Sequence, residues 1–291
     1  MNGFITSNCN STVYAHTKTG DCAQFEGKPL GLIFTDQGAS FPVDENAFKQ
    51  AISEGIYALQ RKRVVPLMKG IVAVAPNGGD ISTSQEGFGP ETPIGINAYR
   101  EDYTITSGGI CLYKQLAKMN GKTIRFFKVD QNNVAYGTYS DGDDSPVFRG
   151  YLATFYVTNR ANSGDTGGAV LLSLFYSLNY EQERINTHAL PVATGLEGLS
   201  GVVLQKAAAN TAKVILACSG EDITSVYGED LAVASLFVSE AGTNPTAVSY
   251  ANGVLSFTAA GSPKFKIADA AVLHAAGIDG IEGESEYVSL S

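Results

Sequence analysis

The chain has 291 residues, of which 44% are hydrophobic and 17% are charged. The hydrophobic share excludes disorder as the default state, and the charged share lies below the roughly 25% typical of soluble proteins. A weakly charged chain with 32 Gly has a bland surface, which suits close contact between identical copies. An ordinary β-rich protein with many turns is the alternative that fits the same composition. The length allows two domains or one large β-rich domain.

The net charge of −9 is concentrated in the C-terminal part of the chain. Residues 1–185 hold 16 Lys and Arg against 18 Asp and Glu, whereas residues 186–291 hold 4 against 11. Because phosphate contacts need Lys and Arg, the acidic part is not expected to bind nucleic acid. The basic cluster at residues 61–63 is too short for a nucleic-acid patch and fits the C-terminal end of a helix.

No run of about 18 apolar residues is present, so no membrane span is expected. The cysteines form no CxxC pair and do not resemble a zinc site. We expect reduced thiols in a protein made in the cytosol, and a disulfide bond between the first two is the alternative. The four cysteines are Cys9, Cys22, Cys111 and Cys218.

The first predicted elements are a strand at residues 29–35, a helix, and a strand-like run at residues 64–75. Asp44 can cap the helix, because Asp accepts hydrogen bonds from the amides of a first turn, and the helix continues to about Gln60. Pro66 places the beginning of the second run at the edge of a sheet. Apolar residues at spacings of four, four and three form one face of this amphipathic helix. They are Phe48, Ile52, Ile56 and Leu59.

A turn is predicted at Asn77–Asp80, and a long polar segment rich in Gly, Pro and Thr follows up to Thr106. The segment has no helical period, but Tyr99–Ile105 has the composition of a strand. A loop of this length inside a compact domain usually has a function or is disordered. We therefore expect residues of about 80–106 to form an extended arm or hairpin that leaves the domain and contacts a neighbour.

A short helix and a β-hairpin are predicted after the arm. Ser107 is expected to cap the helix, which ends at Asn120-Gly121 because Gly readily adopts the left-handed conformation. The hairpin has strands at 123–129 and 134–139.

Two long strands, within residues 149–160 and 168–181, are expected to be covered on both faces. Side chains alternate between the faces of a strand. One face holds Tyr151, Ala153, Phe155 and Val157, and in the second strand Val170, Leu172, Leu174, Tyr176 and Leu178. The other face holds Leu152, Thr154, Tyr156, Leu171, Ser173 and Phe175. Because both faces carry apolar residues, we expect a core on one face and a partner on the other.

The predicted fold class is mainly β with one or two helices (α+β). A polar, Gly-rich segment places a domain boundary at 185/186, between a β-sandwich or barrel at residues 1–185 and a small β-sandwich at residues 186–291. About seven short strands in the second part, among them one at residues 231–238, match an immunoglobulin-like sandwich. Asn252-Gly253 is the strongest hairpin signal there.

One segment invites a catalytic interpretation. Asn162–Gly168 resembles the GDSGG segment of chymotrypsin-like serine proteases, with Thr166 in the place of the nucleophile. His16 is the only upstream candidate base, and His188 and His274 follow in the wrong order. We interpret the segment as a Gly-rich loop between two strands and expect no enzyme.

No metal or cofactor is expected either. The cluster Asp141, Asp143 and Asp144 has the oxygen ligands that Ca²⁺ prefers, but solvated turn carboxylates are the simpler interpretation. The chain has no P-loop, no GxGxxG after a strand and no HExxH. The 14 Tyr and 14 Phe are assigned to core or contacts between copies, with glycan binding as the alternative.

The order of elements resembles one known family. An amphipathic helix, a polar arm, a short helix, a hairpin and two long strands are similar to the tail tube proteins of long-tailed bacteriophages. The hairpin carries Val129-Asp130, Tyr136-Gly137-Thr138 and Asp141-Gly142. The resemblance covers residues 1–180, and the appended sandwich is similar to the immunoglobulin-like decorations of virion proteins.

The resemblance implies a structural virion protein, assembled in the bacterial host cytoplasm, that forms rings, usually hexameric, stacked into a tube. Its partners would be copies of itself and other phage tail proteins, with DNA as non-specific cargo in the lumen. The alternatives are a secreted or surface adhesin of two β-domains that binds glycans, and another virion part such as a head decoration or a connector ring.

Overall fold

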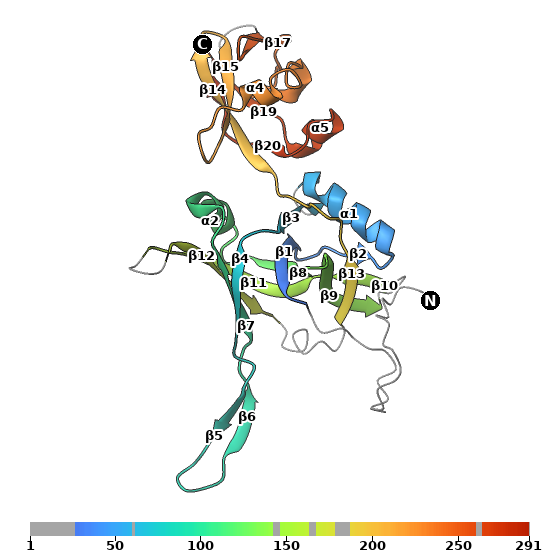
Figure 1. Cartoon of the computed structure of the whole chain (residues 1–291), viewed down its shortest axis with the longest axis vertical. Coiled ribbons are helices and arrows are strands. Elements are labelled where there is room, and N and C mark those ends of the chain that lie inside the picture. The colour runs from blue at the N-terminus through green and yellow to red at the C-terminus, as the bar shows by residue number, and fades with distance from the viewer. Residues whose placement is uncertain are drawn as a thin grey trace. The chain divides into compact units, whose positions relative to one another are not determined.

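The computed structural model describes residues 27–59, 62–141, 146–162, 167–177, 187–259 and 264–290. Within these ranges the chain is mainly β, with four short α-helices. It divides into two compact units, unit 1 with residues 1–56 and 60–196, and unit 2 with residues 57–59 and 197–291. The elements are labelled in Figure 1.

The sheet of unit 1 follows the order β2-β10-β9-β8-β11-β12-β7-β4. Off this path, β1 pairs with β8 and β3, and β13 pairs with β9. It curls into a half-barrel. Its strands are β1 (Pro29–Asp36), β2 (Phe41–Pro42), β3 (Val64–Leu67), β4 (Ile71–Asn77), β7 (Arg100–Ile105), β8 (Thr123–Asp130), β9 (Val134–Asp141), β10 (Pro146–Arg149), β11 (Tyr151–Arg160), β12 (Ala169–Tyr176) and β13 (Thr187–Pro191).

The two long strands pair antiparallel as β11 and β12, from Ala153–Tyr176 to Arg160–Ala169. Gly150 separates β10 from β11, and a side chain there would collide with the backbone of Phe126, 2.7 Å away. The sheet can therefore bend at this point, so that β10 pairs with β9 while β11 pairs with β8.

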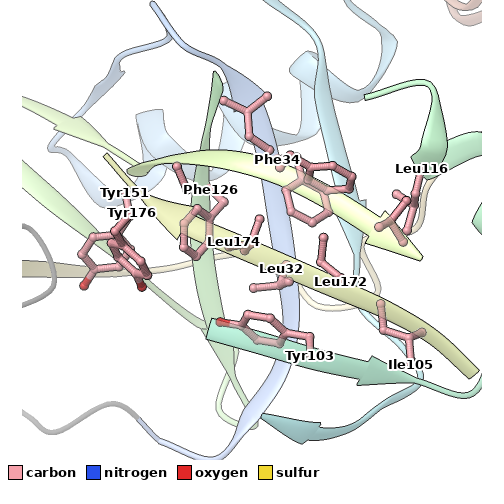
Figure 2. Packing of buried hydrophobic residues seen from close by; sticks show 14 of the residues in the cluster. Leu32, Phe34, Tyr103, Ile105, Leu116, Phe126, Tyr151, Leu172, Leu174 and Tyr176 are labelled. Atoms are coloured by element: carbon pink, nitrogen blue, oxygen red, sulfur yellow. The ribbon is translucent and has the colours of Figure 1, made fainter. Parts of the chain in front are cut away.

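One hydrophobic core fills the inner side of the curl. Figure 2 shows side chains from β1, β7, β8, β11 and β12 converging on one space, with Leu116 at its edge. The predicted inward sets of the long strands are confirmed for the described residues, because all of them are buried. These are Tyr151, Ala153, Phe155, Val157, Val170, Leu172, Leu174 and Tyr176. Leu178 lies outside the described ranges.

The predicted first helix is α1 (Glu45–Tyr57), and Asp44 caps it by accepting a hydrogen bond from the amide of Ala47 at 2.9 Å. Its Phe48 ring contacts Phe41, Phe127 and Phe148 at centroid distances of 5.0–5.8 Å. Ile52 and Ile56 are also buried. Leu59 is not, because the helix ends before it and the side chain is 55% exposed.

Three local predictions are wrong. The run at 64–75 is two strands rather than one, because the chain turns at Gly70, whose φ is 89°. The segment 77–80 does not reverse the chain but continues into the next strand. Ser107 does not cap α2 (Gly109–Ala117); the N-cap is Gly108, and the Ser107 hydroxyl donates to the carbonyl of Lys69 at 3.2 Å.

The predicted hairpin is β8–β9, and the side chain of Asp130 closes its turn. One carboxylate oxygen accepts from the amides of Asn132 at 2.8 Å and Val134 at 3.0 Å, and the other accepts from the hydroxyl of Tyr136 at 3.1 Å. Asn133 adopts the left-handed conformation with φ 58°. Short polar side chains tolerate this conformation best.

Unit 2 has a five-stranded sheet of order β17-β18-β15-β14-β20 and a three-stranded sheet of order β16-β19-β21, which share one hydrophobic core. Asn252 and Gly253 form the tight turn between β17 and β18 as predicted, both with positive φ. The expected strand at 231–238 is largely a turn and the 3-10 helix η2. The elements are β14 (Ser200–Ala208), β15 (Thr211–Leu216), α4 (Thr224–Tyr227), η2 (Ala234–Leu236), β16 (Phe237–Ser239), β17 (Ala247–Ala251), β18 (Val254–Thr258), β19 (Lys264–Ile267), α5 (Ala270–Ala275), β20 (Ile281–Gly283) and β21 (Val288–Ser289).

No sequence pattern predicts α4, α5 or the parallel pairing of β14 with β20. The predicted boundary at 185/186 assigns residues 187–196 to the C-terminal part. They belong to unit 1, because β13 pairs with β9 along its whole length.

Candidate assembly surface

A two-stranded hairpin, β5 (Ile81–Ser84) and β6 (Thr92–Ile96), projects from the sheet of unit 1 (Figure 1). It continues the ribbon of β4 and β7, since Gly79 donates to Asn97 at 3.2 Å and Asn97 donates to Asp80 at 2.9 Å. A side chain at Gly78 would lie 2.0 Å from the carbonyl oxygen of Ala98. The strands can therefore approach closely where the ribbon leaves the sheet. The hairpin lies within the segment for which an arm is expected.

The hairpin exposes apolar side chains to solvent. Ile81 is paired with Ile96, and Ile94 lies in the same strand at a β-bulge. The exposed fractions of Ile81, Ile96 and Ile94 are 66%, 52% and 67%. Phe88, in the loop between the strands, is fully exposed. An isolated two-stranded hairpin is marginally stable in water, and contiguous exposed apolar residues mark interaction sites. This hairpin is therefore suited to contact a partner.

The hairpin is also acidic. No Lys or Arg occurs between Lys69 and Arg100, whereas Asp80, Glu86 and Glu91 lie in this segment. The three acidic side chains are exposed. A partner for the hairpin should therefore combine apolar surface with positive charge.

Glu101 stabilises the root of the hairpin, which is the part of β4 and β7 that continues into it, on the inner side of the sheet. Its carboxylate accepts from the hydroxyls of Tyr99 at 3.0 Å and Tyr103 at 2.5 Å. It also forms an ion pair with Lys128 of β8, at 2.6 Å between Nζ and Oε1. Because Glu101 is buried, these contacts compensate the loss of its hydration.

Asp102 anchors the same root on the outer side. Its Oδ2 accepts from the side-chain Nδ2 of Asn77 at 2.5 Å and from the guanidinium of Arg100 at 3.2 Å, and its Oδ1 accepts from the hydroxyl of Ser173 at 2.5 Å. These donors come from β4, β7 and β12. Two adjacent carboxylates thus fix the ribbon from both faces of the sheet.

The sheet has an open edge along the ribbon. Among the described residues, β4 pairs only with β7, so its outer edge has no partner strand. By contrast, the edge of β11 beyond β8 is capped from within the unit. The side chain of Asn120 accepts from the amide of Val157 at 2.7 Å and donates to its carbonyl at 3.2 Å, as a paired strand would do.

The outer faces of the long strands, for which a covering partner is predicted, are partly exposed. Tyr156 is 47% exposed, and Leu152 and Phe175 are half-buried. The rings of Tyr156 and Phe175 meet edge to face at 5.9 Å, and the guanidinium of Arg100 lies 5.5 Å from the Phe175 ring centroid.

The residues considered for catalysis do not form a described site. His16 and Thr166 lie outside the described ranges, as do Asp143 and Asp144 of the calcium alternative. His188 is buried against the rings of Tyr139 and Phe148, and burial lowers its pKa. His274 contacts Asp279 through Nδ1 at 2.5 Å.

The described ranges contain no group of three or more His, Cys, Asp or Glu side chains arranged to hold a metal ion. In the same ranges, no helix has the length and apolar character that crossing a membrane requires.

The cysteines differ from the expectation of reduced thiols. Cys111 and Cys218 are disulfide-bonded, so this expectation is wrong for both. Cys9 and Cys22 lie outside the described ranges, and the alternative of a bond between them lies there too. No spacing signal in the sequence singles out Cys111 and Cys218.

No protein-family model, curated protein sequence or solved structure matches this chain.

Proposed function

We propose that the chain is a structural virion protein that self-assembles into stacked rings and forms a phage tail tube for the passage of DNA. The observation that carries the proposal is the β5–β6 hairpin, which exposes three isoleucines and Phe88. A hairpin of this kind on a rigid root is useful only when another surface covers it. The copies themselves supply that surface in a self-assembling protein.

The sheet supports the same proposal. An open edge such as that of β4 is an association hazard for a solitary protein, and ring closure removes it. The partly exposed outer faces of β11 and β12 add apolar area that neighbouring copies can bury. Unit 1 would accordingly be the tube-forming domain.

Unit 2 would be an immunoglobulin-like decoration of the tube. Two sheets around one core support this assignment. The parallel pairing of β14 with β20, and the helices α4 and α5, depart from the antiparallel pattern of that fold.

Removal of the hairpin tests the proposal. Deleting Gly87–Asn97 alone would leave β5 without its partner, so we replace the whole of 81–96 by the turn Asn-Gly, which suits a two-residue loop. The variant should keep the thermal unfolding transition of the native chain and lose higher-order assembly in electron micrographs. Stacked assemblies formed by a folded variant without the hairpin would contradict the proposal.

A second candidate function is a secreted or surface adhesin of two β-domains. The disulfide bonding of Cys111 and Cys218 favours it, because disulfides persist in oxidising compartments. Virion surfaces belong to the same class, so the disulfide bonding fits both functions. Glycan-array binding by a monodisperse monomer would support the adhesin.

A further inference from the structure

A cavity beside α2 has the chemistry that the hairpin requires of a partner. It measures about 300 Å³, at the lower end of the roughly 300–1,000 Å³ that ligand pockets occupy. We call it the socket. The lining residues used here are Ile105, Ile110, Asn159, Arg160, Ala169 and Val170.

Apolar side chains line the socket, some of them buried and one of them exposed. Ile105, Ala169 and Val170 are buried, whereas Ile110, on the first turn of α2, is 53% exposed. An exposed isoleucine at the mouth of a cavity gives an entering aromatic ring additional apolar contact. Among the residues that the structure describes, Phe88 of the hairpin is the most exposed aromatic side chain and fits that description.

The socket also offers positive charge. Arg160 Nη2 donates to the carbonyl of Gly167 at 3.3 Å, while its Nε is buried and has no hydrogen-bond partner among the described residues. A buried donor without a partner is costly, and a carboxylate is the acceptor that suits a guanidinium best. The first turn of α2, whose Gly109 and Ile110 line the socket, adds to the positive potential there. Glu86 and Glu91 flank Phe88 in sequence.

The hairpin and the socket lie at opposite ends of one ribbon. In the ribbon of β4 and β7, the cross-strand pair at the socket end is Ile71–Ile105, and the pair at the hairpin end is Asn77–Arg100. At about 3.3 Å per residue the two ends are on the order of 15–20 Å apart. Figure 1 shows α2 and β5–β6 at the two ends of this ribbon. Contacts between two different surfaces of identical copies propagate head to tail.

We propose that the hairpin tip of one copy, residues 85–91, docks in the socket of the next copy. Phe88 enters the cavity, and the carboxylate of Glu86 or Glu91 accepts a hydrogen bond from Arg160. This inference rests on the proposed function, because it identifies the surface that receives the hairpin when copies stack.

Two kinds of variant test the docking. Phe88→Asp disables the tip, and Ile110→Asp or Arg160→Glu disables the socket. Asp on the first turn of α2 is favourable for a helix, so Ile110→Asp should fold, as circular dichroism and thermal unfolding will show. Val226→Asp is the matched control, since Val226 of unit 2 is 67% exposed. Each disabled variant should need at least about tenfold more protein to stack than the native chain or this control.

Mixing the variants gives the decisive result. At a protein concentration at which the native chain stacks but the disabled variants do not, a 1:1 mixture of Phe88→Asp and Ile110→Asp should give a discrete two-layer species by sedimentation and electron microscopy. One intact tip and one intact socket remain in such a mixture. Combining Glu86→Lys and Glu91→Lys with Arg160→Glu in one chain should restore stacking by reversing both charges.

The outcomes separate this inference from the proposed function. If the native chain stacks and Phe88→Asp does not, but both socket variants stack normally, the hairpin is the contact and the socket assignment is overturned. A mixture that stays unstacked although the native chain stacks also overturns it. A native chain that forms no assemblies overturns the docking and the proposed function together.

Discussion

Lys128 Nζ lies 2.6 Å from Glu101 Oε1, and the two side chains are only 14% and 7% exposed. The ammonium group also lies over two aromatic rings, 5.2 Å from the centroid of Tyr151 and 5.6 Å from that of Tyr176. The pair ties β8 to β7, the strand that continues into the projecting hairpin. It therefore joins the core of unit 1 to the root of the candidate assembly surface.

Substitution Glu101→Gln should strongly destabilise the fold, because it removes the carboxylate charge that forms the buried ion pair with Lys128. Breaking a buried pair typically costs about 3–5 kcal/mol. Urea denaturation at neutral pH measures the loss. The matched control is Lys49→Ala, which breaks the exposed i,i+4 pair with Glu45 at 2.7 Å and should cost less than about 0.5 kcal/mol. Equal losses in the two variants would contradict the role given to the buried pair.

The edge cap on β11 gives a second prediction. Asn120→Ala removes both hydrogen bonds between the Asn120 side chain and the backbone of Val157, at a cost of about 1–2 kcal/mol. The Val157 amide, protected in the native chain, should exchange with solvent faster, as native-state hydrogen exchange can measure. Unchanged exchange at Val157 would mean that the cap does not protect this edge.

Asp222 predicts acid sensitivity in unit 2. Its side-chain contact with Lys213, together with hydrogen bonds from Thr224, lowers its pKa to about 2. A carboxyl whose pKa is lower in the folded state stabilises the fold above its unfolded pKa, and this contribution disappears as the pH falls. The loss should occur between about pH 4 and pH 2. In Asp222→Asn the unfolding free energy should vary less with pH over that window; an identical pH profile would refute the assignment.

His188 predicts a dependence at higher pH. Burial lowers its pKa below the ordinary value of 6.5, so the folded state keeps the imidazole neutral while the unfolded chain takes up a proton. The contribution of His188 to stability is therefore fully present above about pH 6.5 and is lost as the pH falls through that value. Chemical denaturation at pH 7.5 and pH 5.5 should show a smaller difference for His188→Gln than for the native chain. A difference at least as large in the variant would contradict this account.

Side-chain periodicity predicted much of unit 1. The alternation in the long strands identified their buried faces, and the spacing of Phe48, Ile52 and Ile56 identified α1, because burial follows directly from these periods. Leu59 fits the same period, but the helix ends before it. Periodicity alone does not define a helix end.

The contacts of the candidate surface could not be predicted in the same way. Polar composition indicated an arm, yet the ion pair of Glu101 with Lys128 joins residues 27 positions apart in the chain. The socket unites α2 with the ends of β11 and β12, whose proximity depends on the register of the sheet. In unit 2, short helices such as α4, with four residues, carry too little pattern to be recognised.

The most direct test of self-assembly is a concentration series of the purified native chain, followed by sedimentation velocity and negative-stain electron microscopy. We expect rings or stacked rings whose share increases with protein concentration. A single monomeric boundary across the whole series, with no rings on the grids, would contradict the account.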